Sequence, residues 1–309
     1  MKLLTLWQDK KARKRWIRYW LAHPFWGMLN YITHYALRYV PIKVNAAIGS
    51  TLGEIAGTKR FVKTHQKVLR NLSLLRPDLD EKAKEQLAVQ MWRNIGQSMT
   101  EYSLSDKLHK QALVSIENYD QHLLPLIEQK QAIIFVFAHT GNWESHGNYV
   151  REKGIDLMCL YKPVENRFSM RIAQNARARM GGVMKLVDAS QPNAMRLVCK
   201  HLAAKGALWI AIDEEKNKQV LCPRFGRAIS LDNSNLAYVV RLARRYRTAI
   251  VPLWTRREGL KQITFIDKPL FVADNDEAVQ AVELQLEAAL ENWIKQHLEQ
   301  WYMLHELRL

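Results

Sequence analysis

In the second half of the chain, short apolar runs alternate with stretches of helical periodicity. The apolar runs have the length and the β-branched or aromatic content of buried strands, and they lie at 132–138, 156–161, 185–187, 207–212, 249–254 and 262–266. Stretches between them have helical character, at 168–180, 193–204 and 233–246. Strands and helices that alternate in this way are typical of an α/β fold, in which helices flank a central, mostly parallel sheet.

The pattern before residue 110 is different, because residues 25–105 favour helices throughout and show no strand-like alternation. Within 80–104 the apolar positions recur every three to four residues, as on one face of a helix. The chain closes with a long amphipathic helix whose apolar positions run from Val279 to Trp301. These patterns predict three parts: a basic amphipathic segment at 1–22, a helical N-terminal region packed on the core at 23–110, and an α/β core with its C-terminal helix at 111–309.

The chain is strongly basic, with 46 Lys and Arg residues against 30 Asp and Glu and a formal net charge of +16. Such an excess favours a polyanionic partner: phospholipid headgroups, nucleic acid or an acidic protein. Near the start, a helical projection separates a basic face from a Trp-rich apolar face, formed respectively by Lys11, Lys14, Arg15 and Arg18 and by Trp16, Ile17, Trp20 and Leu21. This arrangement predicts a helix that lies in the membrane interface on an anionic leaflet. A spanning helix over the uncharged stretch 19–37 and an ordinary helix packed on the core are the alternatives.

Composition also narrows the kinds of site that the chain can hold. Cys159, Cys199 and Cys222 are far apart and have no CxxC partner or His-rich neighbour, which argues against a zinc site or a disulfide framework and fits a reducing compartment. Apart from the start of the chain, basic residues are spread out rather than gathered with aromatics in one groove, so we expect no nucleic-acid partner. We expect neither a metal nor a cofactor.

The strongest candidate for chemistry follows the first long apolar strand. His139 comes at the C-terminal end of that strand, and Glu144 lies five residues further on. Active sites in open α/β sheets lie at that edge, where an imidazole can take a proton from a substrate hydroxyl while a carboxylate holds its tautomer. The two side chains do not share a helical face, but Gly141 and Asn142 allow the chain to turn between them. Amide groups around Gly141, or in the first turn of a following helix, are candidates for an oxyanion site.

Several further motifs follow one another in a definite order. They are Val68-Leu69-Arg70-Asn71-Leu72, the His139-to-Glu144 motif, Tyr161-Lys162-Pro163-Val164-Glu165-Asn166, Arg177-Ala178-Arg179-Met180-Gly181-Gly182, Asp213 at the end of a strand, Phe225-Gly226, Val251-Pro252 and the tail 299–305. In this order and spacing the chain resembles the lysophospholipid acyltransferase superfamily. More closely it resembles the bacterial lipid A biosynthesis acyltransferases, the Kdo2-lipid A lauroyl/myristoyltransferase group. The resemblance extends over most of the chain.

This resemblance implies acyl transfer from an acyl carrier protein thioester to a hydroxyl of a lipid A precursor or a related phosphorylated glycolipid. It places the enzyme at the cytoplasmic face of the inner membrane, as a peripheral or monotopic protein. It implies that His139 deprotonates the acceptor, that Glu144 orients His139, and that no covalent acyl-enzyme forms. Substrate-binding roles then fall to Arg177, Lys162, Asn166, Arg179 and Asp213. A carrier protein, a phosphorylated lipid and an anionic membrane surface are all acidic, in agreement with the basic charge of the chain.

The chain departs from the family pattern in its loops. Glu214 stands where the family usually has Gln, Arg224 precedes Phe225-Gly226 in place of a second Phe, and Ser230-Leu231 replaces a Thr-Pro pair. Two alternatives stay open. One is an acyltransferase of the same superfamily that acts on a lysophospholipid, an aminolipid or a phosphatidylinositol mannoside. The other is a basic membrane-binding protein without catalytic activity.

Overall fold

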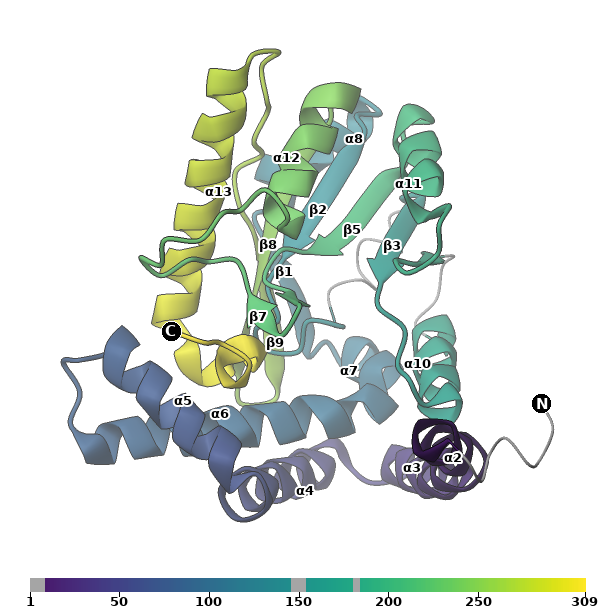
Figure 1. Ribbon diagram of the computed structural model, residues 1–309. Coiled ribbons are helices and arrows are strands. Elements are labelled where there is room, and N and C mark those ends of the chain that lie inside the picture. Colours follow the sequence, from purple (N-terminus) through teal and green to yellow (C-terminus); the bar gives the residue numbers. More distant parts are fainter. Residues whose placement is uncertain (1–8, 146–153, 180–183) are drawn as a thin grey trace.

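The computed structural model describes residues 9–145, 154–179 and 184–309 (Figure 1). Its centre is a seven-stranded sheet with the order β1-β9-β8-β2-β5-β3-β4. Neighbouring strands are parallel except β8 and β9, which are antiparallel. The strands are β1 Val114–Glu117, β2 Ile133–Phe137, β3 Leu157–Tyr161, β4 Met184–Asp188, β5 Ala207–Ala211, β8 Ala249–Glu258 and β9 Lys261–Ile266. The expected α/β fold with a mostly parallel sheet is confirmed, and each expected strand is present.

Helices cover both faces of this sheet, which explains why β2 is apolar at every position. All five residues of β2 are buried. Ile134 and Val136 belong to a core shared with α11, α12 and α13, whereas Phe135 and Phe137 belong to the opposite core, shared with η4 and α8. These elements are α11 Ala194–Ala203, α12 Asn235–Tyr246, α13 Asp276–Gln296, η4 Tyr119–Leu123 and α8 Leu124–Glu128. A parallel strand buried on both faces reads as a continuous apolar run.

The N-terminal helices lie across the end of the sheet toward which β3 and β5 run (Figure 1). They are α2 Lys10–Ile17, η1 Arg18–Ala22, α3 His23–Arg38, α4 Ile42–Ile55, η2 Ala56–Arg60, α5 Val62–Leu75, α6 Glu81–Glu101, η3 Tyr102–Leu104 and α7 Ser105–Lys110. Glycines let α4 and α6 approach closely, since a Cβ on Gly53 would lie 2.2 Å from the carbonyl oxygen of Trp92 and 2.9 Å from Cα of Gly96. These helices therefore cap the carboxyl ends of the strands.

The structure corrects the expected C-terminal helix. Helix α13 ends at Gln296, and the chain continues through the short helix η5 (Leu298–Gln300) to Trp301, which forms an isolated bridge with Thr140. A second short helix, η6 (Tyr302–His305), follows. No Gly or Pro marks this end, and the apolar spacing continues through it, so periodicity alone did not reveal the break.

Other elements were not expected at all. Strand β1 pairs with β9 at one edge of the sheet, and β6 (Glu215–Lys216) and β7 (Gln219–Val220) form a small antiparallel pair. β1 has four residues, and β6 and β7 have two each, so these three strands are too short to produce a periodic signal.

Some expectations fall on residues outside the described ranges. They are the first eight residues of the basic segment, Met180, Gly181 and Gly182, and the helix expected after Glu144. The division at residues 22 and 110 stays a prediction. In the part of the chain that the structure describes, no helix combines the length and apolar character needed to cross a membrane.

Candidate active site

The topology of the sheet brings two strand ends together at its centre. β2 and β5 are parallel neighbours with Phe137 opposite Ala211, and the amide of Ile212 donates to the carbonyl of Phe137 at 3.0 Å. His139 and Asp213 each come two residues after the end of their strand. Their side chains therefore meet at the carboxyl edge, the position at which open α/β sheets bind ligands.

Asp213 holds His139 by two hydrogen bonds. Nδ1 of His139 lies 2.7 Å from Oδ1 of Asp213, and the backbone amide of His139 donates to Oδ2 at 2.8 Å. Trp301 adds a third donor, its Nε1, at 2.8 Å from Oδ2. A carboxylate only accepts, so Nδ1 carries the proton and Nε2 is unprotonated in the neutral ring. No described residue hydrogen-bonds Nε2, and the ring lines a cavity.

The charges around His139 favour its protonated form. Burial by itself lowers the pKa of the imidazole, but the negative charge of Asp213 and the hydrogen bond to it act in the opposite direction. Glu214 and Glu144 add smaller contributions of the same sign, and the net result is a raised pKa. Asp213 itself is fully buried, at 0% exposure. The imidazole is therefore a stronger base than an exposed histidine.

Aromatic rings fix the position of the imidazole from three sides. The ring centroids of Phe137, Trp143 and Tyr302 lie 5.7, 5.2 and 6.3 Å from that of His139. The backbone amide of Tyr302 also donates to the carbonyl of His139 at 2.8 Å. The C-terminal tail thus packs directly against the candidate base.

The contacts of two expected site residues differ from those that we expected. Glu144 does not hold Nδ1 of His139, because Asp213 occupies that position; Glu144 pairs with Arg177 through two hydrogen bonds, Nη2 to Oε1 at 2.6 Å and Nε to Oε2 at 3.0 Å. Asp213, which we expected to bind substrate, is the residue that contacts Nδ1 of His139. The physical reason is that the adjacent strand end reaches Nδ1, whereas the turn after Gly141 carries Glu144 toward α10 (Arg167–Arg179).

The other expected substrate-binding residues lie at different distances from the base. Lys162 lines the same cavity, with its side chain 69% exposed and its Nζ 3.9 Å from a carboxylate oxygen of Glu215. Asn166 precedes α10, accepting from the amide of Phe168 and donating to the carbonyl of His23, so it has a structural role at that helix start. Arg179 donates to Nε2 of His34 at 2.9 Å. Of the three, the structure brings only Lys162 to the cavity that His139 lines.

A buried polar network that the sequence did not indicate holds the turn between His139 and Glu144. Glu101, at 0% exposure, pairs with Arg257 at 2.5 Å and accepts from Nδ2 of Asn142 at 2.9 Å. The amide of Asn142 donates to Oε1 of Gln262 at 3.0 Å, and the amide of Gly141 donates to a backbone carbonyl at 3.2 Å. Since both amides are already engaged, the expected oxyanion role for the groups around Gly141 does not fit this geometry.

Two cavities meet at the Glu144–Arg177 ion pair. One of about 310 Å³ is lined by His139, Glu214 and Asn235. The other, of about 500 Å³ and mostly apolar, lies among α3, α6 with η3, and α10. The residues that line both are Trp143, Glu144, Tyr161, Lys162 and Arg177. The site therefore offers a cavity of mixed polar and apolar lining and a mostly apolar cavity, on either side of one ion pair.

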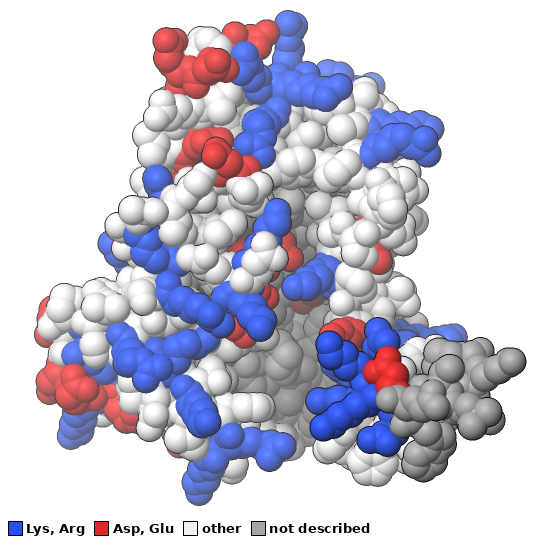
Figure 2. Space-filling view, in the orientation of Figure 1, with Lys and Arg blue, Asp and Glu red and all other residues white. Residues whose placement is uncertain are grey.

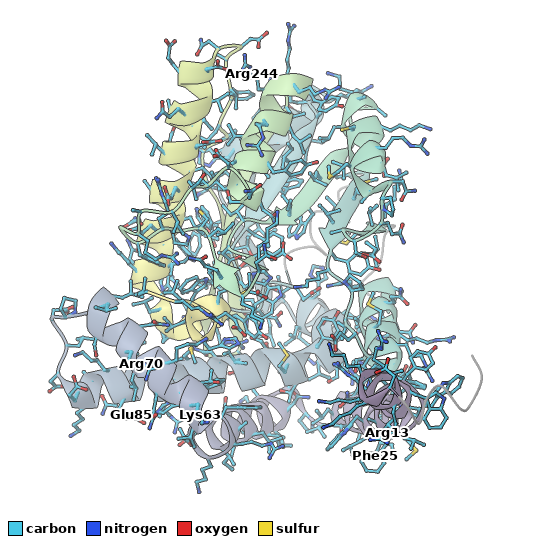
Figure 3. The ribbon with its side chains drawn as sticks, viewed as in Figure 1. Arg13, Phe25, Lys63, Arg70, Glu85 and Arg244 are labelled. Atoms are coloured by element: carbon cyan, nitrogen blue, oxygen red, sulfur yellow. The ribbon has the colours of Figure 1, made fainter. Side chains whose placement is uncertain are left out.

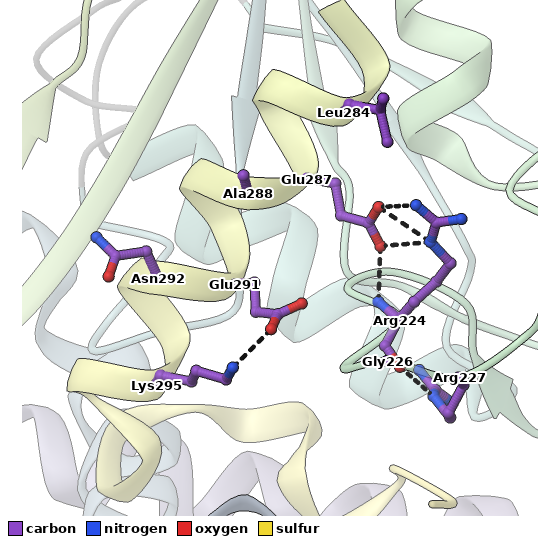
Figure 4. Close-up of a pocket in the computed structure, with 9 residues that line it drawn as sticks. All are labelled: Arg224, Gly226, Arg227, Leu284, Glu287, Ala288, Glu291, Asn292 and Lys295. Atoms are coloured by element: carbon purple, nitrogen blue, oxygen red, sulfur yellow. Dashed lines mark hydrogen bonds and ion pairs between the residues drawn. The ribbon is translucent and has the colours of Figure 1, made fainter. Parts of the chain in front are cut away.

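A larger cavity of about 680 Å³, between α13 and the loop around Arg224, is not this site (Figure 4). Arg224 binds Glu287 of α13 there at 2.5 Å, and Lys295 binds Glu291 at 2.7 Å. Arg227, the third cation that lines this cavity, donates to the backbone carbonyls of Arg224 and Pro223. The departure at Arg224 thus does not reach the His139 cavity. Glu214, in contrast, lines that cavity and accepts from Nδ2 of Asn235 at 2.7 Å.

One comparison with known proteins finds a match. The model of one protein family, described as bacterial lipid A biosynthesis acyltransferase, matches residues 8–308. A search of curated proteins finds no match to the chain.

Proposed function

The chain belongs to the bacterial lipid A biosynthesis acyltransferase family and is an acyltransferase, and from this membership we propose that it transfers a fatty acyl chain from acyl carrier protein to a hydroxyl of a lipid A precursor. The observation that carries the proposal is the 2.7 Å hydrogen bond from Nδ1 of His139 to Asp213, which leaves Nε2 unprotonated in the cavity. A neutral imidazole held in this tautomer is suited to act as a general base.

The reaction is a direct transfer. Nε2 of His139 takes the proton of the acceptor hydroxyl while the hydroxyl oxygen attacks the thioester carbonyl carbon. The tetrahedral intermediate collapses with cleavage of the C–S bond, and the imidazolium returns the proton to the departing thiolate. Asp213 stabilises the imidazolium between these two steps, as a buried carboxylate does beside a catalytic histidine.

A covalent acyl-enzyme is not needed. Cys159 is the cysteine that lines the His139 cavity, and burial raises the pKa of its thiol to about 12. The nearby charge of Arg177 lowers the pKa but does not offset burial. A thiol with such a pKa holds almost no thiolate near neutral pH and is a poor nucleophile.

The two cavities suit two substrates. The apolar cavity among α3, α6 and α10 fits the acyl chain, and the cavity beside His139, with its charged and amide side chains, fits the acceptor hydroxyl. Arg177 and Lys162 lie where the cavities meet and are candidates for phosphate oxygens of the acceptor. In this arrangement Glu144 orients Arg177.

The basic segment at the start of the chain supports a place on the cytoplasmic face of the inner membrane. In α2, Lys14 and Arg15 are exposed, and so are Trp16 and Ile17. A helix with both kinds of side chain exposed binds the interface of an anionic leaflet. The net charge of +16 also favours the acidic carrier protein as donor.

The function is tested with purified protein, acyl carrier protein charged with a fatty acid, and a lipid A precursor. We expect His139→Ala to lower kcat at least about a thousandfold through loss of the general base, with unchanged thermal unfolding. A folded variant with wild-type turnover would refute the assignment.

The acceptor class is tested in the host by mass spectrometry of lipid A with and without the gene. Loss of one acyl chain would support the proposal. An unchanged lipid A profile with an altered phospholipid or aminolipid would point to another acceptor of the same superfamily.

A further inference from the structure

Exposed apolar side chains are concentrated in the N-terminal helices. Seventeen large hydrophobic residues between Trp16 and Val62 are exposed, against seven in all the rest of the described chain. A large exposed apolar surface marks an interaction site. Only part of it belongs to the basic segment at 1–22, because the exposed residues continue along α3 and α4.

Helix α4 shows two faces. Gly49 and Gly53 lie on the face packed against α6, where an added Cβ would overlap atoms of α6. The opposite face exposes Val44, Leu52 and Ile55, at 48, 56 and 45%. Because α6 lies between α4 and the sheet, this apolar face points away from the protein core (Figure 1).

Basic residues surround this apolar face. Lys43 lies at the start of α4, Lys59 and Arg60 lie in η2, and Lys63 lies at the start of α5; all four are exposed. The one acidic residue between Lys10 and Lys67 is Glu54, and Arg93 pairs with it at 2.7 Å.

The pictures place this basic group at the same end of the molecule as the basic segment. Figure 3 shows Lys63 at the same end of the molecule as Arg13 and Phe25, with Arg244 at the opposite end. Lys and Arg gather in Figure 2 over both α2 and α5.

We infer that the exposed face of α4 and η2, together with Val62 and Lys63, is a second bilayer-binding surface that takes an anionic phospholipid leaflet. Apolar side chains enter the acyl boundary, and the surrounding cations meet the headgroups. Charge favours this occupant: no described carboxylate forms an ion pair with Lys43, Lys59, Arg60 or Lys63, so this basic face opposes a second copy of the same basic chain. The inference rests on the proposed function only in taking a membrane as the place of reaction.

Two separate contacts fix an orientation that one helix cannot. A single interfacial helix leaves the protein free to rotate about the helix axis, whereas α2 with α3 and α4 with η2 together define a plane. Helix α3 exposes Phe25 and Ile32 on this side, while its Thr33 and His34 line the apolar cavity. In this arrangement α3 lies between the bilayer and the apolar cavity.

The test is sedimentation of the full chain with vesicles of phosphatidylethanolamine and phosphatidylglycerol, without substrates, so that its outcome does not depend on acyl transfer. Leu52→Ser/Ile55→Ser removes two exposed apolar side chains, and we expect about tenfold weaker partitioning or more. The matched control is Phe271→Ser/Leu284→Ser, whose side chains are 59 and 51% exposed elsewhere and whose loss leaves partitioning unchanged.

Charge is tested separately by Lys59→Gln/Arg60→Gln, with Lys200→Gln/Arg245→Gln as control. We expect about tenfold weaker partitioning of the first variant onto phosphatidylglycerol vesicles and no change on pure phosphatidylcholine. Equal losses in test and control variants would overturn the inference. So would a stable dimer in solution that Leu52→Ser/Ile55→Ser dissociates, which would make the face a contact between copies of the chain.

Discussion

The two ends of the loop at 138–145 are held by different parts of the molecule. At one end, His139 is fixed by Asp213 after a central strand and by the C-terminal tail. At the other end, Glu144 is fixed by Arg177 of α10, and α10 packs against α3 through the hydrogen bond from Asn30 to Ser169 at 3.0 Å. His139, the proposed general base, is therefore held by the buried core. The Glu144–Arg177 pair, at which we propose that the acceptor binds, is held by helices that reach the exposed apolar surface.

This difference predicts two classes of variant. Changes at the sheet-held end should lower kcat and alter its pH dependence, whereas changes at the helix-held end should mainly raise KM for the acceptor.

The largest effect is expected for Asp213→Asn. An amide can donate to Nδ1 and so stabilise the wrong tautomer of His139, and we expect kcat to fall by about 10²–10⁴-fold. The variant also loses the charge that raises the pKa of His139. Because the base acts only when neutral, activity falls as the pH drops through this pKa. The acid limb of the pH–rate profile should therefore move to lower pH.

The matched control is Asp188→Asn, at the end of the edge strand β4, two strands from β5; its carboxylate accepts from Ser190. It should leave both the rate and the acid limb unchanged. An Asp213→Asn enzyme with the wild-type profile would show that Asp213 does not orient the base.

A smaller effect, mainly on KM for the acceptor, is expected for Arg177→Lys at the helix-held end of the loop. Lys keeps the charge but cannot form the two-pronged pair with Glu144. We expect kcat/KM for the phosphorylated acceptor to fall by about ten- to a hundredfold, mostly through KM. Arg171→Lys, on the exposed side of the same helix, is the control and should behave as wild type. If Arg177→Lys lowers kcat alone, the two ends of the loop do not differ in the way proposed.

Trp301→Phe tests whether the tail contributes beyond packing. It removes the Nε1 donor to Asp213, and we expect kcat to fall about tenfold and the free energy of unfolding to fall by about 1–3 kcal/mol. Trp254→Phe removes a similar donor, to Asp267 at 3.2 Å, and should destabilise the fold without lowering kcat. Thermal unfolding and turnover are measured on both. Equal losses of turnover in Trp301→Phe and Trp254→Phe would show that Trp301 contributes only packing.

The contact between Trp301 and Asp213 belongs to the part of the site that the sequence pattern does not predict. Strands β2 and β5 were predicted because burial on both faces makes a continuous apolar run, and His139 was found because it ends such a run. His139 pairs with Asp213 because β2 and β5 are parallel neighbours, whose ends lie side by side. The local periodicity of a sequence does not predict the order of strands in a sheet.

The remaining parts of the site depend on contacts between residues far apart in the chain. Glu101 and Arg257 are separated by 156 positions, and Trp301 and Asp213 by 88. Within α6, Glu101 falls at the end of a regular helical pattern, where an exposed carboxylate is the ordinary expectation. Only the packed fold shows that it is buried and paired.

The smallest effect is expected for Glu214→Gln, which restores the residue usual in the family. Gln is nearly the same size and keeps an acceptor for Asn235, so the maximal rate should stay within about threefold of wild type. Glu214 raises the pKa of His139 through its charge alone, whereas Asp213 acts through charge and a hydrogen bond. Removing the Glu214 charge should therefore lower the pKa of His139 and move the acid limb of kcat/KM to lower pH, by less than Asp213→Asn does.

The matched control is Glu215→Gln, because Glu215 lines the same cavity but is not among the groups that raise the pKa of His139. Its acid limb should coincide with that of wild type. A displacement in Glu215→Gln as large as in Glu214→Gln would mean that the general field of the cavity, rather than the position of Glu214, sets the basicity of His139. The buried strand ends would then not control the base by themselves, and the contrast between the two ends of the loop would be weaker than the geometry indicates.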